Sequence, residues 1–171
     1  MITRRALTLL EVLVVAAIIG LAASLAVVPA YLDYSRARAA SDAATTLAQD
    51  LSLIERAAQN AGPNVGGTLE IISADPLVYE CRYGRPNEID PNSMLGDLIV
   101  RRSFDHVALA QGVISSTTPL LFASNGSAQF VQAGEWSDQH QTIELTLVAS
   151  GDSSRAARVD VNLFTGAIAQ P

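Results

Sequence analysis

A single carboxylate, Glu11, stands at the edge of an apolar run in this 171-residue chain. The run extends from Val12 to Leu32 and contains no charged residue. As an α-helix it would be about 31 Å long, close to the thickness of the hydrocarbon core of a bilayer. Because a lone carboxylate at membrane depth costs several kcal/mol, Glu11 needs a partner or a function there.

The other residues that commonly do chemistry form no catalytic or metal-binding pattern. Cys81 is the only cysteine, which excludes an internal disulfide and a cysteine-based zinc cluster. It alternates with charged residues in a strand-like stretch, so we expect a buried structural thiol. His106 and His140 have no ligand spacing, and we expect them at the surface or at strand ends. The sequence contains no nucleophile elbow, phosphate loop or metalloprotease helix, so we expect no enzyme, cofactor or metal site.

Two further motifs have ordinary structural explanations. The acidic segment 87–97 is rich in oxygen ligands of the kind that bind calcium. It lacks the EF-hand spacing, which favours a solvated loop. Asn125-Gly126-Ser127 matches a glycosylation sequon, and its turn chemistry explains it without a sugar.

The residues around the apolar run indicate export. Arg4 and Arg5 precede it, and basic flanks stay in the cytoplasm, so the rest of the chain is expected on the other side of the membrane. A cleaved secretory signal has a shorter apolar core, of about 7–15 residues. A plain signal anchor fits the length but gives no reason for Glu11.

The stretch from Arg4 to Val15, R-R-A-L-T-L-L-E-V-L-V-V, resembles the type IV prepilin signature. In that signature a basic leader and a small residue precede an apolar residue, T-L-x-E and an apolar helix. The resemblance implies that prepilin peptidase cleaves between Ala6 and Leu7 and methylates the new amine. It also implies an assembly role for Glu11. Ala6 and Leu7 stand where the family usually has Gly and Phe.

Helical periodicity continues beyond the apolar run. From Ala37 to Ala58 small and apolar residues recur at spacings of three and four, and polar residues, Asp50 among them, are expected on the other faces. The helix is expected to end at Asn60-Ala61-Gly62-Pro63. Gly20 and Pro29 are the expected sites of a bend, since Pro29 lacks the N–H of a helical hydrogen bond.

From Thr68 onward the apolar period changes to two, which predicts strands. Asn125-Gly126 predicts a hairpin turn. Short strands with turns between them favour an antiparallel sheet or sandwich packed on the helix, an α+β fold. The expected strands are Thr68–Ser73, Leu77–Tyr83, Leu98–Arg102, His106–Ala110, Leu120–Ala123, Ala128–Gln132, Thr142–Ala149 and Arg158–Phe164.

The C-terminal strands are similar to those of H-type minor pseudopilins and of T- and U-type minor pilins. In those proteins a strand leads to a Gly turn, and the chain closes with a basic residue, a strand and Thr-Gly. The corresponding residues here are Phe122, Gly126, Arg158, Thr165 and Gly166.

The resemblance implies four parts: a leader (1–6), a transmembrane and assembly half of the helix (7–34), an amphipathic half (35–61) and a periplasmic β-rich domain (62–171). It implies a minor pilin or pseudopilin with a cytoplasmic N-terminus, held in the bacterial inner membrane until it joins a type II secretion pseudopilus or a type IV pilus. The implied partners are prepilin peptidase, other pilin or pseudopilin subunits and the inner-membrane assembly platform.

Two alternatives belong to other classes. One is a single-pass anchored periplasmic binding domain that does not polymerise, and the other is a secreted hydrolase. The T-type relatives include DNA-binding subunits. The net charge here is −6 and the arginines are scattered, so we expect no nucleic-acid partner.

Overall fold

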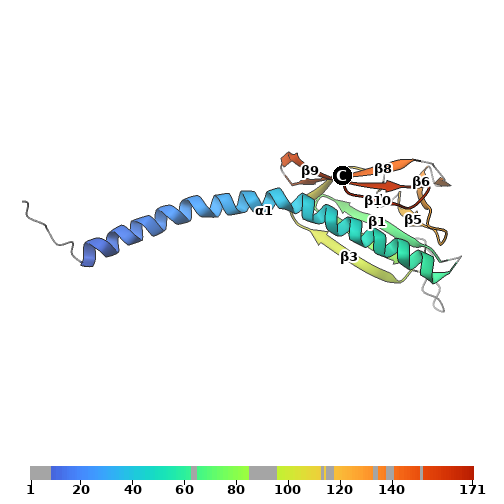
Figure 1. Ribbon diagram of the computed structural model, residues 1–171, viewed down its shortest axis with the longest axis horizontal. Coiled ribbons are helices and arrows are strands. Elements are labelled where there is room, and N and C mark those ends of the chain that lie inside the picture. The colour runs from blue at the N-terminus through green and yellow to red at the C-terminus, as the bar shows by residue number, and fades with distance from the viewer. Residues whose placement is uncertain are drawn as a thin grey trace, which may run out of the picture. The chain divides into compact units, whose positions relative to one another are not determined.

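The computed structural model describes residues 9–62, 65–84, 96–112, 114, 118–132, 135–137, 141–150 and 152–171. One long helix, α1 (Leu9–Ala61), is followed by antiparallel β-strands, which confirms the α+β prediction (Figure 1). The chain divides after Arg36 into two compact units.

The first unit contains the apolar part of α1. The helix continues through both Gly20 and Pro29. Each side chain that the structure describes between Leu9 and Arg36 is exposed. Within the described residues, this part of α1 is long and apolar enough to cross a membrane.

The second unit, Ala37–Pro171, begins with the amphipathic part of α1. The expected stripe is buried here, and its members are Ala40, Ala43, Ala44, Leu47, Leu51, Ile54 and Ala58. The helix ends at Ala61, and Gly62 follows it with a φ of 102°, a conformation that glycine adopts without strain. The buried stripe and the end of the helix at Ala61 both agree with the prediction from the sequence.

Two antiparallel sheets make up the rest of this unit. The six-stranded sheet has the order β3 (Leu98–Phe104), β2 (Leu77–Tyr83), β1 (Gly67–Ala74), β5 (Leu120–Phe122), β6 (Ala128–Gln132) and β7 (Glu135–Ser137). The four-stranded sheet has the order β10 (Ile168–Ala169), β9 (Asp152–Asn162), β8 (Thr142–Ala149) and β4 (Val107–Gln111).

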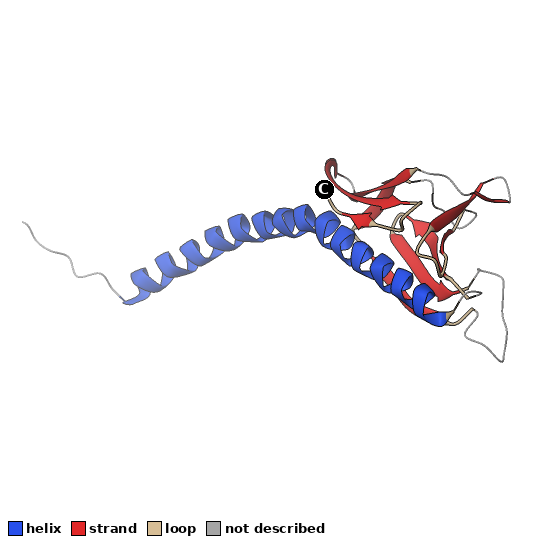
Figure 2. Ribbon diagram, turned by 45° about the vertical axis from the view of Figure 1, so that its right-hand side comes forward, coloured by secondary structure: helices blue, strands red, loops and turns tan. Residues whose placement is uncertain are grey.

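Both sheets contribute side chains to one core with the buried stripe of α1. Figure 2 shows this part of α1 running alongside the strands. Leu51 and Ile54 belong to the same cluster of buried side chains as Tyr79 and Leu145. Strand β1 lies against the helix so closely that a Cβ on Gly67 would come within 2.5 Å of Ile54 Cγ2. Gly67 therefore sets the distance between helix and sheet.

The Asn125-Gly126 hairpin joins β5 to β6 as predicted. Gly126 has a φ of 85°, and Asn125 Oδ1 accepts hydrogen bonds from the N–H and hydroxyl of Ser127 at 3.0 and 2.7 Å. These bonds explain the sequon residues as turn chemistry. A Cβ on Gly166 would collide with the carbonyl oxygen of Gly126, so the two Gly turns pack directly on each other.

The last predicted strand differs from the observed one. Strand β9 begins at Asp152, six positions before the expected Arg158, and ends at Asn162. Its early residues are mostly exposed and show no alternation, so pairing with β8 extends the strand where the pattern does not. Phe164 was expected inside the strand and lies instead in an exposed turn. The short strands β7 and β10 were not predicted.

Candidate functional site

Glu11 lies in the first turn of α1, and no other charged residue occurs between Leu9 and Leu32. A carboxylate at this position interacts favourably with the positive end of the helix dipole. Its neighbours on the helix are exposed apolar side chains, such as Leu10 and Val14. The carboxylate therefore stands at one end of an uninterrupted apolar surface.

This surface is continuous, unlike the scattered single apolar side chains that many proteins expose. Large apolar side chains remain more than half exposed along its length, among them Leu9, Ile18, Leu25 and Val27. Tyr31 and Tyr34 are exposed near its end. A contiguous apolar surface of this kind marks a contact with lipid or with other protein.

Several predicted site residues lie outside the described part of the chain. These are Arg4 and Arg5, which were expected to orient the helix, and Ala6 and Leu7, which were expected to flank a cleavage site. His140 and most of the segment 87–97 also lie outside it. Among the described residues, no three His, Cys, Asp or Glu side chains gather in a way that could hold a metal ion.

Asp50 is buried, contrary to the prediction from the sequence. It was expected on a polar face of α1, yet it is only 4% exposed. Its Oδ2 accepts a hydrogen bond from the Tyr79 hydroxyl at 2.8 Å and one from Arg102 Nε at 3.0 Å. Its Oδ1 accepts a second bond from Arg102 at 3.2 Å. Asp50 thus joins α1 to both β2 and β3.

The electrostatics of this cluster follow from burial and from the carboxylate. Burial raises the pKa of Tyr79 above its usual range, and the hydrogen bond to Asp50 raises it further. The same carboxylate raises the pKa of Arg102. Because every charge has a hydrogen-bonded partner, the cluster fits a structural clamp between helix and sheet.

A second buried carboxylate, Glu80, lies on β2. Arg82 contacts its Oε2 with two nitrogens, at 2.5 and 3.0 Å, and Arg101 contacts its Oε1 at 3.0 Å. Cys81, between Glu80 and Arg82, is fully buried, which confirms the prediction. Burial raises the pKa of this thiol, which keeps it protonated and unreactive.

Two further predicted residues, His106 and Arg158, lie at the surface. His106 is exposed in the turn between β3 and β4, as expected. Arg158 forms ion pairs with Asp160 and Glu144, at 2.5 and 2.9 Å. Carboxylates therefore neutralise much of the positive charge near the C-terminal strands.

Comparison of the chain with protein-family models, with curated proteins and with solved structures finds no match. Among the described residues, the polar clusters around Asp50 and Glu80 are satisfied internally. The apolar side chains of α1 that follow Glu11 remain exposed, so this part of the helix is the candidate functional site.

Proposed function

We propose that this protein is a minor pilin or pseudopilin subunit that assembles through the apolar half of α1. The observation that carries the proposal is the position of Glu11 as the one carboxylate at the start of a long exposed apolar helix. That helix continues without a break into the core of the β-rich unit. A subunit of this kind is a membrane protein before assembly and part of a helical bundle afterwards.

The carboxylate fits such a bundle better than it fits a plain anchor. Cleavage before Leu7 creates a charged amine four residues before Glu11. In lipid or between apolar helices, each charge is costly unless it is paired. Glu11 can meet the amine of an adjoining subunit and so fix the axial register between the two. An anchor that never polymerises has no need for this group.

The proposal assigns the rest of the chain accordingly. Arg4 and Arg5 keep the N-terminus in the cytoplasm, and the β-rich unit lies in the periplasm. The proposed partners are prepilin peptidase, other pilin or pseudopilin subunits and the inner-membrane assembly platform. The filament is a type II secretion pseudopilus or a type IV pilus.

Complementation of a deletion strain with Glu11→Gln tests the proposal. We expect normal export, cleavage and protein level, with impaired filament assembly, because stranding one partner of a desolvated pair costs about 3–5 kcal/mol. Glu55→Gln makes the same change in the other half of α1 and is the matched control. Full assembly by Glu11→Gln at normal protein level would contradict the proposal and favour the anchored binding domain.

A further inference from the structure

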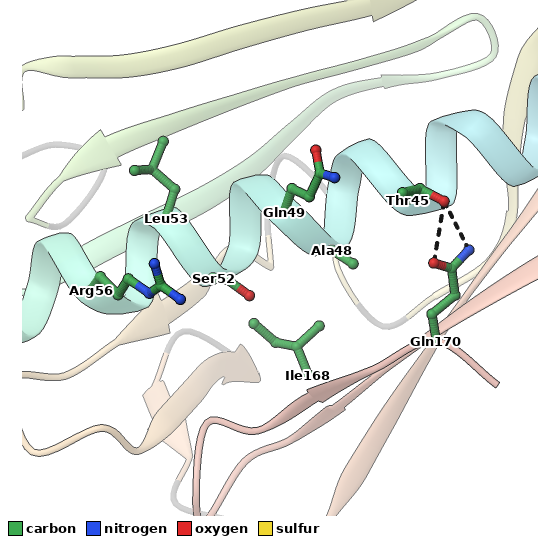
Figure 3. A pocket seen from close by; sticks show the side chains of 8 residues that line it. All are labelled: Thr45, Ala48, Gln49, Ser52, Leu53, Arg56, Ile168 and Gln170. Carbon is green, nitrogen blue, oxygen red and sulfur yellow. Dashed lines mark hydrogen bonds between the residues drawn. The ribbon is translucent and has the colours of Figure 1, made fainter.

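A groove of about 550 Å³ lies between α1 and the C-terminal strand of the second unit. One wall is a face of α1 that includes Ala48, Leu53 and Arg56, and the other wall includes Ile168 and Gln170. Figure 3 shows Gln170 bonded to Thr45 at one end of the groove, at 3.2 Å, and Arg56 toward the other end. Ile168 points from its strand toward the helix between them.

Among the described strands, the one that borders the groove has a free edge. Strand β10 is the outermost strand of its sheet and pairs with β9 on one side only. The N–H of Asn162 on β9 donates to the carbonyl of Ala167 at 2.8 Å. Hydrogen-bonded groups alternate along an antiparallel strand, so the N–H and C=O of the next residue, Ile168, point away from β9. An unpaired strand edge is a template for another strand.

The charge of the groove contrasts with that of the chain. The chain carries a net charge of −6, yet the described residues that line the groove include no carboxylate. Arg56 forms no ion pair with any residue in the described ranges, whereas Arg82, Arg101 and Arg102 each pair with a buried acid. As far as the described residues show, the groove therefore offers the positive charge of Arg56 to an occupant.

We propose that this groove binds an extended, acidic segment of a partner polypeptide, which adds as a strand to the free edge of β10. The segment's backbone hydrogen-bonds to the N–H and C=O of Ile168, which is the mode of β-strand addition. One of its apolar side chains covers Leu53, which is 46% exposed. A carboxylate of the segment lies beside Arg56. The proposal concerns the second unit and holds whether or not the chain polymerises.

Three synthetic octapeptides test this inference on the full chain in detergent micelles. The first alternates valine and threonine around one glutamate, the second has lysine in place of the glutamate, and the third is the glutamate peptide with N-methylated central amides. Backbone amide shifts are followed by NMR during each titration. We expect the glutamate peptide to shift the signals of Ile168 and Leu53, and the other two peptides to bind more weakly.

Two variants test the role of charge. Arg56→Gln should weaken binding of the glutamate peptide roughly two- to fivefold, the range for an exposed ion pair. Arg155→Gln, which removes an arginine that does not line the groove, should leave binding unchanged.

Four results would overturn the proposal. These are no shift at Ile168, equal binding of the N-methylated peptide, equal binding of the lysine peptide, and shifts of the same signals with protein concentration alone. The last result would identify a second copy of the chain as the occupant.

Discussion

The two stretches of α1, Leu9–Arg36 and Ala37–Ala61, place similar apolar side chains in different surroundings. Before Arg36, each described side chain is exposed, including leucines and isoleucines. After Ala39, leucines at positions such as Leu47 and Leu51 are at most 1% exposed beneath the β-strands. One helix therefore contains a part that packs within its own unit and a part whose apolar side chains stay exposed.

Deletion of residues 1–34 should produce the largest change. A chain that starts at Ser35 loses the exposed apolar surface and keeps the buried stripe, so we expect it to fold in water without detergent. Circular dichroism should show β-sheet with one helix. An unfolded or aggregated product would show that the second stretch of α1 also depends on the first.

One substitution made in both stretches sharpens the comparison. Leu51→Ala removes a fully buried side chain and should lower the free energy of unfolding of the β-rich unit by about 2–5 kcal/mol. Leu21→Ala removes a side chain that is 68% exposed and should leave that free energy unchanged. Urea unfolding of the full chain in micelles measures both. Equal losses in the free energy of unfolding would contradict the division of α1 into an exposed part and a part buried in the second unit.

A smaller effect is expected at the clamp around Asp50. Asp50→Ala leaves the buried Tyr79 hydroxyl and Arg102 without their shared acceptor. We therefore expect the free energy of unfolding to fall by about 2–4 kcal/mol. Asp42→Ala removes an exposed carboxylate from the same helix. Its free energy of unfolding should stay within about 0.5 kcal/mol of the parent value. The same unfolding measurement separates the two, and a similar small loss in both would mean that the clamp adds no stability.

The smallest effect concerns alkaline pH. Because the pKa of Tyr79 is raised in the folded state, the folded protein keeps this proton above about pH 10, where tyrosine in the unfolded chain loses it. The contribution to stability is complete below pH 10 and falls as the pH rises further. Tyr79→Phe should lose about 1–2 kcal/mol at neutral pH and decline less steeply above pH 10. If the free energy of unfolding fell equally steeply above pH 10 in the parent and in Tyr79→Phe, the raised pKa of Tyr79 would be contradicted.

The sequence predicted those elements whose pattern is local. Strands β2, β6 and β8 have the expected bounds, because alternation and turn residues mark both of their ends. Strands β7 and β10 contain three and two residues and exist through pairing with a neighbour, which no local pattern records. The early start of β9 has the same origin.

The partners of Asp50 in the clamp could not be predicted from the sequence. Its partners lie 29 and 52 positions away, so no motif joins them. Helical spacing still carried a signal, because Asp50 follows Leu47 by three positions and precedes Ile54 by four. That spacing places a carboxylate on the buried stripe and predicts a buried polar partner.

The mass of the mature protein tests the central claim most directly. If the protein is a processed pilin-like subunit, intact-mass analysis of membrane-extracted protein will show the loss of Met1 to Ala6 and the gain of one methyl group. Leu7 is then the methylated N-terminus, four residues before Glu11. An uncleaved chain, or cleavage after Ala23 or Ala30, would contradict the account.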